Sequence, residues 1–142
     1  MKSSKEILSS VLKTTQMGQI GIRSVLDTSM RPGLRKALES QLHEYDSLEI
    51  EAHSIATQRG WDLEELDPAV RFMADMMTRV KLAGRNNDSK IAGMMIQGNT
   101  RGMIKGLKNI RQFAGQDEQI HILSQKLLDC ETANIRQMQG YL

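Results

Sequence analysis

Apolar residues recur at steps of three and four along almost the whole chain, in long segments that proline or glycine separates. This spacing places them on one face of an α-helix, which must then be buried against other helices. The clearest stripe consists of Leu34, Leu38, Gln41, Tyr45, Leu48, Ala52 and Ile55. The pattern predicts an all-α fold with helices at about residues 4–28, 31–59, 68–84, 88–114 and 117–140.

Short motifs mark the ends of these helices. Ser3 and Glu6 have the spacing of a capping box, in which each side chain bonds the backbone amide of the other. Asp67 followed by Pro68 predicts the start of the third helix, because Asp caps an N-terminus and Pro suits the first turn. The predicted C-terminal caps are Gly60, Gly84 and Gly115.

The lengths of the connections predict how the helices are arranged. Short joints between the first and second helices, and between the fourth and fifth, force antiparallel hairpins. The stretch from Gly60 to Asn87 instead holds a helix that covers ~25 Å and can travel the height of a bundle. We therefore expect one domain, residues 1–142, forming an up-down four-helix bundle whose long crossover contains a short extra helix. The alternative is a plain five-helix array.

Four positions near the middle of the long helices are informative: Gln16, the segment Glu44-Tyr45-Asp46-Ser47, Gln97, and the segment Asp129-Cys130-Glu131-Thr132. With this helix order, the chain resembles the ferritin-like superfamily, and more narrowly its small bacterial members of unknown function. The resemblance covers nearly the whole chain and rests on architecture. It implies a ferritin-like bundle, and working members carry Glu and Glu-x-x-His at these positions to bind two metal ions.

The resemblance also implies that the metal site is degenerate. Two amides stand where two carboxylates are expected, and no His accompanies the remaining acids. Two divalent ions need several anionic oxygens to offset their charge. We therefore expect no cofactor. The alternative, a bound Fe or Mn pair, would use Glu44, Asp129 and Glu131, with Gln16 and Gln97 as weak oxygen ligands.

Neutral polar residues on the inner stripes predict a hydrogen-bonded core network instead of a metal centre. Amides satisfy one another without the desolvation penalty of buried charges. The expected members are Gln16, Gln41, Tyr45, Gln97 and Asn134.

Several glycines lie inside the expected helices, where each costs about 1 kcal/mol relative to Ala. They are Gly18, Gly21, Gly98, Gly102 and Gly106. We expect them to allow close approach between helices, especially between the first and fourth. The alternative is that they leave room for a ligand beside methionine side chains.

Charge is segregated although the chain carries only +2 overall, with 19 Lys and Arg against 17 Asp and Glu. The second helix is acidic, and the fourth carries a basic stripe of Arg101, Lys105, Lys108 and Arg111. Exposure of these two helix faces to solvent explains both the acidic and the basic residues. Alternatives are charge complementarity within the bundle or between subunits, and contact with an anionic partner. Nucleic acid is disfavoured because the stripe lacks aromatic residues and the chain is nearly neutral.

Composition excludes other classes of function. A single cysteine, Cys130, excludes an intrachain disulfide framework, and three histidines leave little for a His-based metal centre. No apolar run is long enough for a membrane span, and no signal-peptide core follows the N-terminus. We therefore expect a cytoplasmic protein. Because no enzyme signature appears, we expect no catalysis.

Three functional hypotheses follow. The first is a non-catalytic bundle that acts through self-association, with a dimer favoured, or through a protein partner. The second is a divergent di-metal carboxylate protein, either iron-handling or oxidase-like. The third is a small-molecule-binding bundle, which needs a cavity of at least ~300 Å³ beside the glycines of the fourth helix.

Overall fold

A computed structural model describes residues 2–82, 87–113 and 117–142. Its helices are α1 (Ser4–Leu26), α2 (Pro32–Arg59), α3 (Pro68–Leu82), α4 (Asp88–Gln112) and α5 (Glu118–Gln139). The predicted helices therefore form, with ends that differ by at most two residues in the described ranges. The expected helix ends at residues 84 and 114, and the expected caps Gly84 and Gly115, lie outside the described residues.

The predicted helix starts and the cap at Gly60 are confirmed. The Ser3 hydroxyl accepts a hydrogen bond from the Glu6 amide at 3.2 Å, which is the first half of the predicted capping box. The Glu6 carboxylate accepts from the Ser3 hydroxyl at 3.3 Å, so the second half is replaced by a contact between side chains. The carboxylate of Asp67 accepts a hydrogen bond from the amide of Ala69 at 2.8 Å, in the first turn of α3. Gly60 has φ of 65°, the left-handed conformation that favours glycine at the end of a helix.

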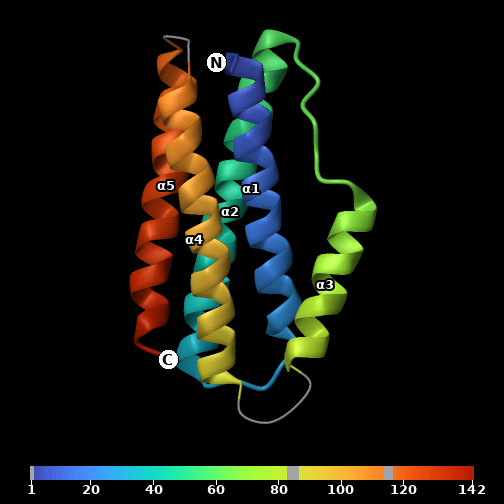
Figure 1. The fold of residues 1–142 in the computed structure, drawn as a ribbon, viewed down its shortest axis with the longest axis vertical. Coiled ribbons are helices and arrows are strands. Elements are labelled where there is room, and N and C mark those ends of the chain that lie inside the picture. Colours follow the sequence, from blue (N-terminus) through green and yellow to red (C-terminus); the bar gives the residue numbers. More distant parts are fainter. Residues whose placement is uncertain (1, 83–86, 114–116) are drawn as a thin grey trace.

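The helices form two antiparallel hairpins joined by a crossover (Figure 1). α1 and α2 make the first hairpin, and α4 and α5 make the second. Between them the chain descends the length of the bundle through an extended segment and α3, so that α2 and α4 run in the same direction. α3 lies outside the other four helices and packs mainly against α1. The predicted all-helical bundle is therefore confirmed.

The core lies between the inner stripes of the four long helices. The second-helix stripe is entirely buried, from Leu34 to Ile55. α3 also carries apolar residues at steps of three and four, but they are not buried, because this helix packs mainly against α1: Val70, Met73 and Met77 are 47%, 62% and 57% exposed. Of the helices in the described part of the chain, none has the length and apolarity needed to cross a bilayer.

Polar contacts from α1 fix the crossover in place. The buried side chain of Gln16 donates to Glu65 at 3.1 Å and accepts from the amide of Leu66 at 3.1 Å. Near the other end of α1, the hydroxyl of Ser24 donates to the carboxylate of Asp75 on α3. These contacts hold an extended segment and a helix beside the α1–α4 pair, and that placement creates the site described next.

Candidate functional site

A pocket of about 460 Å³ lies beside the bundle, bounded by α1, α3 and α4, with side chains of α2 and α5 at its floor. Its volume exceeds the ~300 Å³ needed for a small-molecule site. The walls are mainly apolar and rich in methionine. They include Met17, Ile20, Ile22, Leu66, Ala74, Met77, Met94 and Met95.

The helical glycines make room for side chains and for this pocket. A Cβ atom on Gly18 would lie 2.5 Å from the Tyr45 ring, and one on Gly102 would lie 2.2 Å from the Glu131 carboxylate. A Cβ atom on Gly98 would meet nothing within 4 Å. The expected close approach between helices is therefore present at Gly18 and Gly102, but it joins α1 to α2 and α4 to α5, so the emphasis on α1 and α4 is wrong at these positions. Gly18 and Gly102 admit side chains from α2 and α5, and Gly98 borders open space in the pocket.

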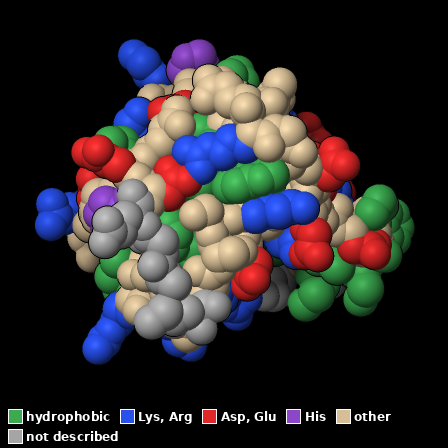
Figure 2. Space-filling model, turned by 90° about the horizontal axis from the view of Figure 1, so that it is seen from above, with side chains coloured by type: hydrophobic (Ala, Val, Ile, Leu, Met, Phe, Trp, Pro, Cys, Tyr) green, Lys and Arg blue, Asp and Glu red, His purple; other side chains and the backbone are tan. Residues whose placement is uncertain are grey.

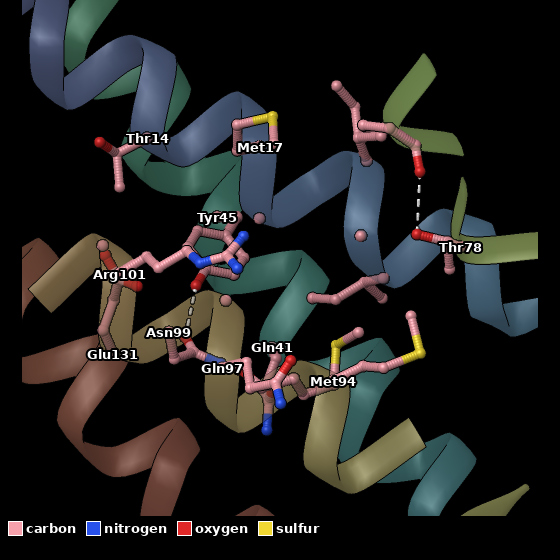
Figure 3. Close-up of a pocket in the computed structure, with 18 of the residues that line it drawn as sticks. Thr14, Met17, Gln41, Tyr45, Thr78, Met94, Gln97, Asn99, Arg101 and Glu131 are labelled. Carbon is pink, nitrogen blue, oxygen red and sulfur yellow. Dashed lines mark hydrogen bonds between the residues drawn. The ribbon is translucent and has the colours of Figure 1, made fainter. Parts of the chain in front are cut away.

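A hydrogen-bonded group of buried side chains stands at the floor of the pocket. The hydroxyl of Tyr45 donates to Asn99 Oδ1 at 2.8 Å, as Figure 3 shows. Asn134 Nδ2 lies 3.5 Å from the Tyr45 oxygen and 3.4 Å from Asn99 Oδ1. The group therefore links α2, α4 and α5. Asn99 is not among the residues expected in the core network, although its spacing of four residues from Met95 and eight from Ile91 places it on the same inner stripe.

The predicted five-residue network is only partly formed. Tyr45 and Asn134 belong to the group at the floor, whereas Gln41 donates to Gln137 Oε1 at 2.8 Å. Gln16 holds the crossover through Glu65 and Leu66. Gln97 is exposed, so its expected place in the core network is wrong. Helical periodicity fixed the heights of Gln16 and Gln97 but left open which side of each helix faces the core.

Glu131 has the most unusual environment of the residues lining the pocket. Its side chain is 2% exposed, and its Oε1 atom has no hydrogen-bond partner in the part of the chain that the structure describes. Burial raises the pKa of this carboxyl from 4.5 to about 8, so it is mainly protonated at neutral pH. The Oε1 atom of Gln41, also on the pocket wall, likewise lacks a partner among the described residues.

The neighbouring thiol of Cys130 is held in its neutral form. It donates to the Glu44 carboxylate at 3.2 Å. Burial, together with this bond and the negative charge of Glu44, raises the pKa of Cys130 to about 12. A thiol in this state is a poor nucleophile.

The residues proposed as an alternative metal site do not fit a metal pair. Glu44 bonds the Cys130 thiol, and Asp129 is exposed and accepts a hydrogen bond from Gln125. Gln16 and Gln97 have the separate placements described above. In residues 2–82, 87–113 and 117–142 no three His, Cys, Asp or Glu side chains are arranged to hold an ion. No chemistry is therefore assigned to an iron or manganese pair.

The basic stripe of α4 divides into two parts. Arg101 and Lys105 line the pocket together with Lys13 of α1, whereas Lys108 and Arg111 are exposed elsewhere on the helix. The acids of α2 pair with other helices: Asp46 with Arg23 of α1, and Glu51 with Lys126 of α5. Within the described ranges no ion pair joins α2 to α4, so the alternative of charge complementarity between these two helices is not formed within one chain.

Comparison with known proteins bears on the fold. No protein-family model matches this chain, and no curated protein matches it in sequence. The crystal structure of a DUF305 fragment from Deinococcus radiodurans is similar, with a TM-score of 0.77 and 11% sequence identity. The likeness covers 96% of this chain and 93% of that chain. At this identity the likeness shows a shared all-helical fold and nothing about ligands or activity.

Proposed function

We propose that this protein binds a small molecule in the pocket between α1, α3 and α4. The single observation that carries this proposal is the buried carboxyl of Glu131 at the wall of a 460 Å³ pocket, whose Oε1 atom has no hydrogen-bond partner among the described residues. Apolar walls with a few fixed polar groups are typical of ligand sites. A buried polar atom without a partner is rare in folded proteins, and a ligand in the pocket would supply one.

Methionine methyl groups give a direct test of this binding. A set of small apolar compounds is titrated into protein with isotope-labelled methionine methyls and followed by NMR. We expect shifts at Met17, Met77, Met94 and Met95, which line the pocket, and none at Met138, which is buried elsewhere. Shifts confined to the exposed Met73 and Met76, or no shifts at all, would contradict the proposal.

A matched pair of variants separates pocket binding from surface binding. Gly98→Phe places a ring in the pocket and should abolish binding. We expect this variant to keep the fold, because no described residue lies within 4 Å of its Cβ position. Gly93→Phe is the control, because its Cβ position is equally open but Gly93 does not line the pocket. Equal binding by both variants would place the ligand elsewhere.

Self-association through the outer face of α3 is the second candidate function. Its apolar residues lie at the edge of the molecule, where Figure 2 shows hydrophobic side chains gathered. Phe72 is 64% exposed and Met76 is 49% exposed, and such apolar surface on a helix is typical of a protein interface. A homodimer is the expected product, as in the first of the three hypotheses drawn from the sequence.

Sedimentation measures the oligomeric state and so tests self-association through α3. If α3 forms the interface, the protein sediments as a dimer and Phe72→Glu converts it to a monomer. Ile50→Glu is the matched control, since Ile50 is 70% exposed on α2 and should leave the dimer intact. A monomer in the unmodified protein contradicts this function.

The ferritin-like relationship belongs to the same proposal. Two hairpins joined by a crossover that descends the bundle support it (Figure 1). On this account the protein is a ferritin-like bundle without a metal centre. Its ligand occupies a pocket outside the four-helix core.

A further inference from the structure

The pocket has a cationic end and an apolar end. α1 and α4 run antiparallel, so Lys13 of α1 lies level with Lys105 and Arg101 of α4. Toward the other end, a Cβ atom on Gly21 would lie 3.9 Å from Met95 Cε, and Met94 and Met77 continue the wall. Figure 3 shows the same separation, with Arg101 at one side of the pocket and Met94 and Thr78 toward the other.

The cationic end continues into a second cavity of about 350 Å³ that shares Lys13 and Lys105 with the pocket. Lys2 and Lys5 also line this cavity, as do the acids Glu6, Asp62 and Glu64. Lys13 is paired with Glu64 at 2.7 Å. Among the residues that the structure describes, no carboxylate lies within ion-pair distance of Lys105, so this ammonium is available at the junction of the two cavities.

Like charges and burial at this junction oppose the protonated form of Lys105. Burial, and then the nearby ammonium groups of Lys13 and Lys2, lower the pKa of Lys105. An anion placed here would relieve the repulsion among these lysines. The buried carboxyl of Glu131 presents little opposing charge, because burial raises its pKa to about 8, and its protonated form can donate a hydrogen bond to an anion.

We propose that the ligand is a single-chain amphipathic anion, with its carboxylate or phosphate head at Lys105 and its apolar chain along the groove between α1 and α4. This inference rests on the proposed function and names the class of its ligand. Residues 13 to 22 of α1 border the groove, a length of about 13 Å that an extended chain of about ten carbons would fill.

Titration calorimetry with ligands of equal chain length tests the head group. Decanoate should bind about tenfold more tightly than decanol or decylamine, because one charge-assisted contact contributes that much. Acetate and inorganic phosphate should not bind measurably, since they lack the chain. Tight binding of acetate or phosphate alone would overturn the proposal, as would equal binding of decanol or tighter binding of decylamine.

A pair of lysine variants assigns the contact. Lys105→Gln should weaken decanoate binding about tenfold and leave decanol binding unchanged. Lys108→Gln removes the same charge from an exposed position of the same helix that does not line the pocket, and it should change neither. Equal effects of the two variants would overturn the assignment to Lys105.

The two levels of the proposal fail differently. If decanol and decylamine shift the pocket methionines as strongly as decanoate does, the pocket binds ligands and the anionic head is wrong. If none of the three shifts them, the proposed function itself is contradicted. The protein could instead sediment with anionic lipid vesicles and fail to bind free decanoate. This result would indicate a membrane surface as the source of the anion and would overturn the proposal of a free ligand.

Discussion

At the scale of single residues, Glu131 makes the stability of the fold depend on pH. Its pKa is about 8 in the folded protein and 4.5 ordinarily, so the folded state retains a proton that the unfolded chain releases between these values. The stabilisation that comes from this bound proton is fully present below pH 4.5 and is lost as the pH rises through 8. The free energy of unfolding should therefore fall across this range, by up to about 5 kcal/mol.

Urea unfolding at a series of pH values checks this prediction. Glu131→Gln is the matched variant, because it keeps the shape of the side chain and cannot ionise. It should lack this fall in stability and exceed the unmodified protein above pH 8. Parallel pH profiles for the two proteins would show that Glu131 is not desolvated.

Two glycines in the pocket wall should respond to alanine in opposite directions. Gly18→Ala brings a Cβ atom to 2.5 Å from the Tyr45 ring, which is packed and cannot yield cheaply, so we expect destabilisation of about 1–3 kcal/mol. Gly98→Ala meets nothing within 4 Å and should stabilise α4 by up to about 1 kcal/mol. Thermal unfolding measures both effects. An equal shift in melting temperature for the two variants would contradict the packing described for these glycines.

The thiol of Cys130 should react slowly with alkylating reagents. A pKa near 12 against the ordinary 9.0 lowers its thiolate fraction by about a thousandfold at neutral pH. The rate should rise in Glu44→Gln, which removes the negative charge beside the thiol while keeping an oxygen that can accept from it. It should remain below that of the unfolded chain, because burial persists. A reaction rate equal to that of the unfolded protein would contradict the buried environment of this thiol.

At the scale of elements, α2 and α3 show what periodicity can predict. The whole stripe from Leu34 to Ile55 is buried as expected, because α2 has neighbours along its length. α3 has an equally regular pattern, yet Met73 and Phe72 are exposed. Periodicity defines an apolar face but not whether another element covers it, and α3 has a single main neighbour.

The contacts of α3 predict that it opens more readily than the rest of the bundle. Its ties to α1 include the Ser24–Asp75 hydrogen bond and the Arg79–Asp27 ion pair at 3.4 Å. Amide hydrogen exchange should therefore be faster in α3 than in α1 or α5. Ser24→Ala should speed exchange in α3 at least about tenfold and leave α5 unchanged, since a hydrogen bond to a carboxylate is lost. Equal protection of α3 and α5 would contradict this view.

At the scale of the whole molecule, local signals were enough to predict the helices and their hairpins. The capping box at Ser3, the cap at Gly60 and the length of the crossover depend on neighbours in sequence. The pocket does not depend on neighbours in sequence, because it forms where α3 packs against α1. Gln16 and Ser24 hold the crossover and α3 there through contacts between residues about 50 positions apart. Leu66 and Thr78 thus enter the site although no motif marks them.

The central claim is that the space between α1, α3 and α4 receives a ligand. The most direct test is a crystal structure of the protein grown with decanoate. The account predicts an extended chain between Met17 and Met94, with its carboxylate in ion-pair contact with Lys105. A groove closed by the protein's own side chains, or decanoate found only on the outer face of α3, would contradict it.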